Sequence, residues 1–471
     1  MTEAPSARTL GQLKADGYQV STVREELRRN LIARLRTDDP IFTDVLGYEE
    51  TVIPQIENAL LSGQDIIFLG ERGQAKTRMA RSLVNLLDEW IPIIAGSEIM
   101  DDPYDPVSRY ARDLVHEHGD DTPIEWISRE DRFAEKLATP DTTIADLIGE
   151  VDPIKVAEGR YLSDELTIHY GLIPRTNRGI FVINELPDLA ERIQVGLLNI
   201  MEERDVQIRG YRVRLPLDVF VVASANPEDY TNRGRIITPL KDRYGSQIRT
   251  HYPNTTELEI DIMEQERIHF DSDGITVAVP QYMREIIADI THLARRSHDI
   301  SQRSGVSVRM SIANYENIVS NSLKRAIRLN EKHAVPRPSD LRAVFASTTG
   351  KIELETMGEA QEDRVIDKLV QGAMVTTFNS YFSVRDFDDL LLAFDNGLTV
   401  EVADDLDAMH YVHQVSHMDD LREGLKKLEL PSSPEGVASG VEFILEGLHL
   451  NRRLNKDSVI GAASGRKRYQ S

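Results

Sequence analysis

The chain has 471 residues, of which 41% are hydrophobic and 28% charged, a balance typical of a folded globular protein of about three domains. Its 55 basic and 78 acidic residues give a formal net charge of -23, which argues against broad binding to nucleic acid or to an anionic membrane surface. The absence of cysteine excludes disulfides, no apolar run reaches the roughly 18 residues of a membrane span, and we expect a cytoplasmic protein.

The first elements in chain order are helices. Residues 1–40 form a charged segment with a helical pattern that is clearest at 23–36. Residues 41–62 predict a turn at Gly47 followed by an amphipathic helix.

Residues 65–77, DIIFLGERGQAKT, have the pattern of a phosphate-binding loop. The apolar run at the start of this stretch predicts a buried strand, and a helical pattern continues through 78–90. The spacing from Gly70 to Thr77 fits G-x-x-x-x-G-K-[ST], with Ala75 where the second glycine is expected. The methyl group of Ala75 is a small steric change that need not block a phosphate.

Such a loop suits the phosphates of ATP. Its backbone N–H groups surround an anion, Lys76 reaches the β- and γ-phosphates from an exposed loop, and the Thr77 hydroxyl holds Mg²⁺. The alternative is a chance match in which Lys76 is a solvated residue at a helix start, but the order of strand, loop and helix argues against it. The residues expected around the nucleotide are Gly70, Glu71, Arg72, Gly73, Gln74, Ala75, Lys76, Thr77 and Arg78.

The segments between the main strands have weaker patterns. Residues 91–131 are rich in proline and acids and predict a surface insertion. Residues 132–138 predict a strand. Later in the chain, alternation predicts a hairpin that turns near Gly210, and 241–253 predict another short strand.

Two further buried strands end in polar residues. Residues 179–187, GIFVINELP, lead into Asn184 and Glu185, and residues 219–227, VFVVASANP, lead into Asn226. Strands that alternate with helices predict a parallel α/β sheet, whose ligand site lies beyond the carboxyl ends of the strands. These polar residues and the loop after the first strand therefore predict a single site.

From residue 254 the strand signals stop. Residues 254–350 predict a helical lid domain, and residues 351–471 are helical and acidic, with a basic tail at 465–471 that we expect to be disordered. The predicted division is a helical N-terminal segment, an α/β core, the lid and the C-terminal region, at 1–40, 41–253, 254–350 and 351–471.

His410, His413 and His417 stand at positions i, i+3 and i+7, which puts them on one face of a helix. This spacing would allow a shared metal and equally suits a packing stripe. Because no nearby residue predicts a further ligand of structural-zinc type, exposed or partly packed histidines are the favoured interpretation.

Taken together, the motifs resemble those of the AAA+ ATPases, in the branch of the MoxR proteins and the magnesium-chelatase I subunits. The resemblance covers about residues 41–350. The matching stretches are GERGQAKT for the phosphate loop, NRGIFVINE for the Walker B strand, LLNIMEERDVQIRGYRVRLP for a helix and hairpin, SANPEDY for sensor 1, LKDRYGSQIR for the arginine finger and SGVSVRMS for sensor 2. The stretch from IADLIGEVD to RTNRG is similar to an insert that marks the branch. The resemblance implies an α/β core with a helical lid and a ring, usually of six subunits, with ATP between neighbours.

The resemblance also implies roles for single residues. Glu185 would be the base that polarises the attacking water, and Asn226 would be sensor 1. Arg309 would reach ATP from the lid as sensor 2. Arg243 would be the finger inserted into a neighbour's site, with Arg249 and Arg235 as alternatives. The competing interpretations are a helix cap for Asn226 and surface ion pairs for the arginines.

One position departs from the family pattern. Asn184 stands where the Walker B aspartate is expected, so the metal-binding set becomes Thr77, Asn184 and Glu185. An amide oxygen can accept a hydrogen bond from metal-bound water but brings no negative charge. We favour an active, slow ATPase over a subunit that only binds nucleotide.

The resemblance leaves several functions open. A ring that remodels a protein partner, commonly one with a von Willebrand A domain, is the first. The I subunit of a magnesium-chelatase-type metal insertase, which works with larger subunits, is the second. The net charge argues against a nucleic-acid motor, and the absence of a GAFTGA loop argues against an enhancer-dependent transcription activator.

Overall fold

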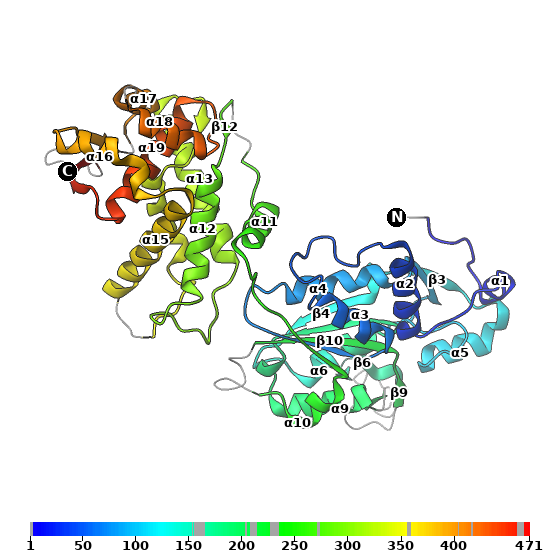
Figure 1. Ribbon diagram of the computed structural model, residues 1–471. Helices are drawn as coiled ribbons and strands as arrows, with labels where there is room; N and C mark the ends of the chain where they lie inside the picture. Colours follow the sequence, from blue (N-terminus) through cyan, green and yellow to red (C-terminus); the bar gives the residue numbers. More distant parts are fainter. Residues whose placement is uncertain are drawn as a thin grey trace. The chain divides into compact units, whose positions relative to one another are not determined.

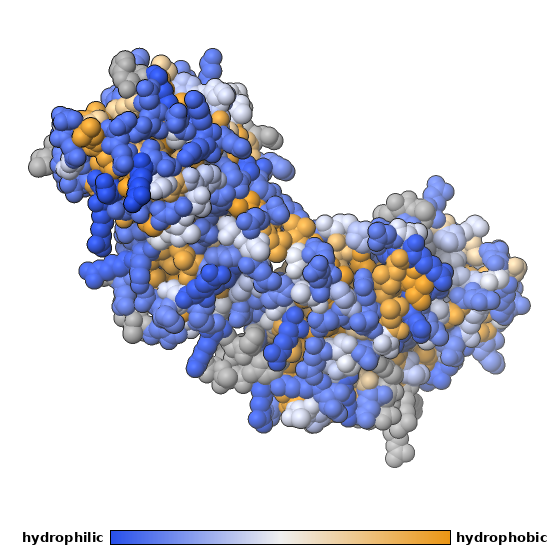
Figure 2. Space-filling model, in the orientation of Figure 1, coloured by the Kyte–Doolittle hydropathy of each residue, from blue (hydrophilic) through white to orange (hydrophobic). Residues whose placement is uncertain are grey.

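The computed structural model describes residues 3–152, 154, 165–202, 205–207, 214–226, 235–270, 274–355, 359–403, 405–415, 418–458 and 466–471. The chain divides into two compact units, Met1–His251 and Tyr252–Ser471 (Figure 1). Hydrophilic residues predominate on the face of both units seen in Figure 2, and the apolar residues form separate cores beneath. No helix among the described residues is long and apolar enough to cross a membrane.

The first unit is built on a five-stranded sheet in the order β11-β1-β10-β7-β4. Every neighbouring pair is parallel, which confirms the predicted parallel α/β sheet. The strands are β1 (Ile66–Leu69), β4 (Phe133–Leu137), β7 (Gly179–Asn184), β10 (Val219–Ala225) and β11 (Ser246–Arg249). β7 and β10 are buried along their whole length, as expected of parallel strands that are covered on both faces.

Helices cover both faces of this sheet (Figure 1). Successive strand residues point to opposite faces, so Phe68 and Val182 pack under one layer of helices while Ile67 and Phe181 pack under the other. The first layer is α2 (Val23–Thr37), α3 (Ile53–Leu61) and α4 (Lys76–Ser82). The second layer is α6 (Ile144–Leu147), α8 (Leu172–Arg175), α9 (Glu191–Glu202) and α10 (Thr238–Arg243).

The predicted insertion at 91–131 contains more structure than its pattern indicated. β2 (Trp90–Ile94) pairs with β3 (Ile124–Ser128) in an antiparallel sheet, and α5 (Arg109–His118) lies between them in the chain. The helix after the phosphate loop is shorter than the predicted 78–90, because α4 ends at Ser82 and β2 begins at Trp90.

The other small elements of the first unit are α1 (Leu10–Ala15) and two antiparallel strand pairs. β5 (Gly149–Val151) pairs with β6 (Ile168–Tyr170), and β8 (Asp205–Gln207) pairs with β9 (Arg214–Pro216). The second pair is the predicted hairpin, and its turn near Gly210 lies outside the described residues.

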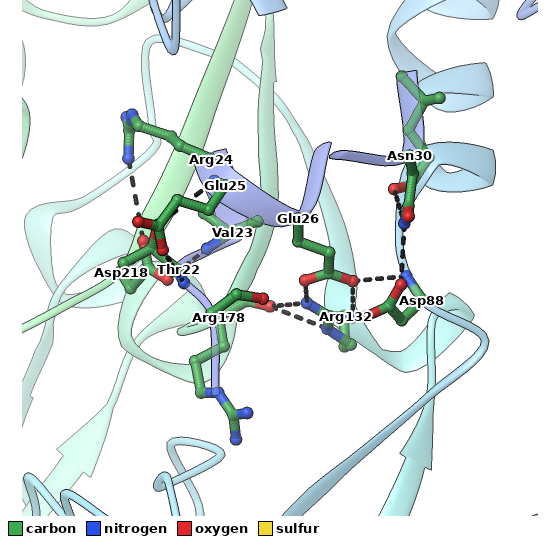
Figure 3. A network of polar contacts seen from close by, with 12 residues as sticks. Thr22, Val23, Arg24, Glu25, Glu26, Asn30, Asp88, Arg132, Arg178 and Asp218 are labelled. Carbon is green, nitrogen blue, oxygen red and sulfur yellow. Dashed lines mark hydrogen bonds and ion pairs between the residues drawn. The ribbon is translucent and has the colours of Figure 1, made fainter. Parts of the chain in front are cut away.

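A buried ion pair joins α2 to the amino ends of β4 and β7 (Figure 3). Arg132 donates to both carboxylate oxygens of Glu26 at 2.8 and 2.6 Å, and these side chains are only 1% and 3% exposed. Arg132 also donates to the carbonyl oxygen of Arg178, at 2.8 and 2.6 Å. A buried charge of this kind is tolerated because it is paired and all three guanidinium nitrogens are hydrogen-bonded.

We expect Glu26→Ala to lower the free energy of unfolding of the first unit by about 3–5 kcal/mol, because it leaves the buried Arg132 charge unpaired. Urea denaturation, followed by hydrogen exchange of the β4 and β7 amides, measures the loss. The matched control is Arg29→Ala on the same helix, which breaks an ion pair with Asp88 whose side chains are 52% and 36% exposed. The control should cost less than about 1 kcal/mol, and equal losses for the two variants would contradict the importance of burial.

The second unit is mainly helical. One hydrophobic cluster extends from Ile260 to Tyr469, and within it the rings of Tyr282 and Phe443 stack 4.1 Å apart. Residues of the predicted lid and of the predicted C-terminal region therefore share a core, and the four-part division of the chain stays a prediction. The helices are α11 (Thr256–Glu266), α12 (Gln281–Ala294), α13 (Arg309–Leu329), α14 (Val344–Thr348), α15 (Glu359–Tyr381), α16 (Asp388–Asp395), α17 (Ala408–Val415), α18 (Asp419–Lys427) and α19 (Pro434–Leu450).

Residues 466–471 of the basic tail are ordered, and the prediction of disorder was wrong for them. β16 (Lys467–Gln470) is the middle strand of an antiparallel sheet between β14 (Val400–Val402) and β15 (Asn455–Ser458). Tyr469 is buried in the core, and Arg468 lies 2.5 Å from a carboxylate oxygen of Glu401. The composition of the tail gave no sign of this pairing, because β14 comes from a distant position in the chain.

The three histidines do not form a metal site in the part of the chain that the structure describes. His410 and His413 lie on α17, and His417 falls outside the described residues. Among the described residues, no group of three or more histidine and carboxylate side chains could hold a metal.

Candidate functional site

The carboxyl ends of the central strands lie side by side. Leu69 of β1 pairs with Ala225 of β10, and Ala223 pairs with Ile183 of β7. The N–H of Gly70 donates to the carbonyl oxygen of Ala225 at 3.1 Å. β1 lies between β11 and β10, where the strand order reverses, and open α/β sheets bind ligands at such a point.

The loop after β1 is braced by the end of β11. A Cβ added at Gly70 would lie 1.9 Å from Thr250 Oγ1 and 2.2 Å from Gln74 Oε1, so only glycine fits this position. Thr250 Oγ1 donates to Gln74 Oε1 at 2.6 Å. Tyr48 donates to the carbonyl oxygens of Gln74 and His251 at 3.1 and 2.7 Å, and burial raises the pKa of the Tyr48 hydroxyl.

Ala75 has a left-handed backbone, with φ of 54° and ψ of 13°, immediately before the first residue of α4. Residues other than glycine adopt this conformation at a cost of about 1–2 kcal/mol. The structure thus gives a conformational reason for the usual glycine, where the sequence indicated only the steric size of a methyl group.

We expect Ala75→Gly to raise the stability of the first unit by about 0.5–1 kcal/mol, because glycine relieves the strain at positive φ but adds entropy to the unfolded chain. The thermal melting of the full-length protein measures this. The control is Ala33→Gly in the interior of α2, where the backbone is helical and glycine should cost about 1 kcal/mol. A lower melting temperature for Ala75→Gly would contradict the strain at this position.

Lys76 is buried, with 7% exposure, and the expectation of an exposed loop residue was wrong. Its ammonium group donates to the carbonyl oxygens of Gly70 and Glu71 and to Asn226 Oδ1, the last two at 2.7 Å. These acceptors wrap around the charge and withdraw it from solvent.

Asn226 connects Lys76 to Glu185. Its Nδ2 donates to Glu185 Oε2 at 2.7 Å while its Oδ1 accepts from Lys76. Glu185 has a left-handed backbone, with φ of 55°, and its N–H donates to Ser224 Oγ at 3.3 Å. Strained backbone of this kind persists where the surrounding structure enforces it. Three residues expected at the site from sequence are thus joined by direct hydrogen bonds.

Asn184, at the end of β7, is buried, and both its amide oxygen and its amide nitrogen are hydrogen-bonded. Oδ1 accepts from Thr77 Oγ1 at 3.4 Å and from Ser224 Oγ at 3.1 Å, while Nδ2 donates to Glu135 Oε1 at 2.8 Å. The Glu135 carboxylate also binds Arg81 on α4, at 2.6 and 2.8 Å, and this hydrogen bonding raises the pKa of the Arg81 guanidinium.

Sequence reasoning missed Ser224, Glu135 and Arg81. The one available signal was an acid within the predicted strand at 132–138, and sequence alone could not show which neighbour it meets.

The other loop residues expected at the nucleotide have different surroundings. Arg78 donates to the carbonyl oxygen of Asp44 at 3.0 Å, and Glu71 accepts from Gln74 Nε2 at 3.2 Å. Arg72 is exposed, and Gly73 has a φ of 74°.

The arginines expected from the resemblance have different surroundings. Arg243 ends α10, where it donates to Glu202 Oε2 at 3.0 Å through Nε and to the carbonyl oxygen of Pro239 at 2.8 Å. Arg235 is exposed, 4.0 Å from Glu191. Arg249 ends β11 beside Leu69 and is exposed. Arg309 is the first residue of α13, in the second unit.

Comparison with known proteins identifies relatives. The chain is 28% identical over 249 residues to the magnesium-chelatase subunit ChlI of Nostoc sp., covering 50% of this chain and 60% of that protein. It is 26% identical over 239 residues to the chloroplastic subunit ChlI-1 of Arabidopsis thaliana, covering 49% and 52%. The magnesium-chelatase I subunits, which are AAA+ ATPases, are thus homologues of this chain.

Two further similarities are more limited. The model of the Sigma-54 interaction domain family matches residues 158–240 of the AAA+ chain, a stretch that includes Asn184, Glu185 and Asn226. A crystal structure of NtrX from Brucella abortus matches at 14% identity with a TM-score of 0.39, over 74% of this chain and 66% of that one. A score of that size supports no further argument. The chain spans about half to two thirds of the length of the curated relatives that it matches.

Proposed function

We propose that this AAA+ chain binds ATP together with Mg²⁺ and hydrolyses the ATP. The observation that supports this best is the hydrogen-bonded series from Lys76 through Asn226 to Glu185. It joins a loop with phosphate-binding spacing to a carboxylate at the carboxyl ends of parallel strands, the position where such sheets bind ligands.

The residues around the loop suit both ATP and Mg²⁺. At Gly70 the backbone approaches Thr250 so closely that any side chain would fill the space. Thr77, Asn184 and Glu185 offer hydroxyl, amide and carboxylate oxygens, which are the ligand types that Mg²⁺ prefers.

Each residue of the series has a distinct task in hydrolysis. When bound, Mg²⁺ neutralises charge on the β- and γ-phosphates. Lys76 donates to those phosphates, and Glu185 accepts a proton from the attacking water. Asn226 holds the Glu185 carboxylate through its amide N–H, which fixes the direction in which the base can act.

We expect Glu185→Gln to retain ATP affinity and to hydrolyse ATP at least about a hundredfold more slowly, because the glutamine amide cannot take up the proton. Phosphate release measures the rate, and calorimetry measures the affinity. Glu117→Gln, a change at an exposed acid on α5, should leave both values unchanged. Near-normal turnover by Glu185→Gln would remove this residue from the role of base.

We further propose that copies of the chain assemble head to tail into a ring, with Arg243 completing the site of a neighbour. The resemblance to the family implies six subunits in this ring. The Arg243 guanidinium is 25% exposed and is paired with Glu202, which is itself 56% exposed. It can therefore exchange this carboxylate for a phosphate presented by another subunit. A planar guanidinium suits the charge that develops on the phosphate oxygens during hydrolysis.

We expect Arg243→Ala to bind ATP but to hydrolyse it about a thousandfold more slowly, the scale of a lost arginine finger. Mixing it with Lys76→Ala should restore part of the activity, because some seams then pair an intact loop with an intact arginine. Phosphate release from the mixed rings measures this. Since Lys76 is buried, circular dichroism must first show that Lys76→Ala is folded.

The control for the arginine is Glu202→Gln, which weakens the same ion pair but keeps Arg243. If Glu202→Gln is active, the loss of activity in Arg243→Ala comes from the missing arginine and not from the broken ion pair. Two inactive variants that co-assemble without regaining turnover would show that Arg243 does not act across a seam.

The client of the ring has two candidates. Protein remodelling with a von Willebrand A-domain partner is the first, and the cytoplasm is the setting that we propose for it. The names of the curated relatives favour the second, the I subunit of a chelatase-type insertase with larger subunits. The proteins encoded beside this chain distinguish the two, since a large porphyrin-binding subunit supports only the second. A protein that binds ATP but never turns it over, even with its partner, would instead be a nucleotide-binding subunit.

A further inference from the structure

Position 184, the last residue of β7, lacks the negative charge that usually helps to hold Mg²⁺ beside a phosphate loop. Asn184 occupies this position, and its amide oxygen accepts from the Thr77 hydroxyl, the group expected to bind the metal. Any negative charge beyond that of Glu185 must therefore come from elsewhere in the site.

Glu135 on β4 lies on the same face of the sheet as Asn184. In the parallel pair, Leu137 is opposite Asn184 and Glu135 is opposite Val182, so residues two apart place both side chains under the α4 layer. Glu135 Oε1 accepts from Asn184 Nδ2 at 2.8 Å.

The surroundings fix the direction of the Asn184 amide. Its oxygen faces the hydroxyl groups of Thr77 and Ser224, both of which can donate, and its NH₂ group faces a carboxylate, which can only accept. The amide therefore links the Thr77 hydroxyl directly to the carboxylate of Glu135.

We propose that Glu135 supplies the negative charge of the Mg²⁺ site, in place of an acid at position 184. This inference rests on the proposed binding of ATP with Mg²⁺. Glu135 acts through Asn184 as a positioning and charge-balancing residue. The negative charge that is missing at position 184 is then carried by Glu135 on the neighbouring strand, in addition to the charge of Glu185.

The same contact explains why asparagine suits position 184. An aspartate there would place two carboxylates at hydrogen-bonding distance in a buried setting, and like charges so close are strongly disfavoured. Asparagine replaces this repulsion with a hydrogen bond.

Arg81 holds the Glu135 carboxylate without removing it from the site. Its Nε and one terminal nitrogen bind the two carboxylate oxygens, but its side chain is 62% exposed. Exposed ion pairs of this kind contribute little free energy, and the solvent screens their charge. Removing the guanidinium should therefore leave the carboxylate facing Asn184 with more of its charge unbalanced.

The test compares the affinity of the full-length protein for adenylyl imidodiphosphate, an ATP analogue that is not hydrolysed, with Mg²⁺ and with EDTA. Isothermal titration calorimetry gives the factor by which Mg²⁺ tightens binding. We expect Glu135→Gln to reduce this factor by about ten- to a hundredfold, the effect typical of outer-shell metal partners. Binding in EDTA should change little.

The matched control is Arg81→Gln, which breaks the same ion pair from its other end. If Glu135 acts by its charge, Arg81→Gln should keep or increase the Mg²⁺ factor. If Glu135 is only an anchor for α4, the two variants should have the same effect, and the inference would be overturned. An unchanged factor in Glu135→Gln would overturn it as well.

The double variant Glu135→Gln with Asn184→Asp moves the acid back to β7 and reverses the hydrogen bond between the two side chains. It should recover a Mg²⁺ factor near that of the wild type. Asn184→Asp alone should melt at a lower temperature without Mg²⁺ and bind Mg²⁺ more tightly. Should Glu135→Gln fail to fold, the double variant decides: recovery supports the charge exchange, and loss of the Mg²⁺ factor overturns it.

Binding of the analogue by the wild type tests the proposed nucleotide site independently of Glu135. If the wild type shows no Mg²⁺-dependent binding of the analogue, the proposed nucleotide site fails, and the inference fails with it. If the wild type binds normally while Glu135→Gln matches it, only the role of Glu135 is lost.

Discussion

The parallel register of β1, β10 and β7 is the constraint on which the site depends. It brings the ends of three strands from distant parts of the chain to one edge, so that Lys76, Asn226 and Glu185 come within hydrogen-bonding distance. A slip of one residue in any of these strands would turn its side chains to the opposite face. Alternate apolar residues of each strand are buried under the two helix layers, and this burial fixes the register of the strand.

Polar contacts at the amino ends of the strands reinforce this register. Arg24 binds Asp65 at 2.6 Å, and the same Asp65 oxygen accepts from the N–H of Val221 at 2.9 Å, which ties α2 to β1 and β10. The pair of Glu26 and Arg132 does the same for β4 and β7 (Figure 3). One helix therefore anchors the amino ends of the strands whose carboxyl ends carry the site.

The site contains features that oppose stability. Ala75 and Glu185 have left-handed backbones, and the charge of Lys76 is buried. Each is held by neighbours, the first two by the loop and the strand end, and the third by the acceptors around its ammonium group. Such local costs are common where a site is organised before its ligand arrives. The sheet beneath the site stabilises the chain against these local costs.

The sequence by itself determined the strands of the central sheet, the phosphate loop and the residues at the strand ends, because apolar runs, glycine spacing and polar strand ends are local patterns. It could not show that Lys76 is buried, that Ala75 is left-handed or that the basic tail forms β16. Nor could it connect Glu135 to Asn184, since a strand pattern does not tell which strand is its neighbour. The contacts of Lys76 with Asn226, of β16 with β14 and of Glu135 with Asn184 join residues far apart in the chain, and only the tertiary structure brings these together.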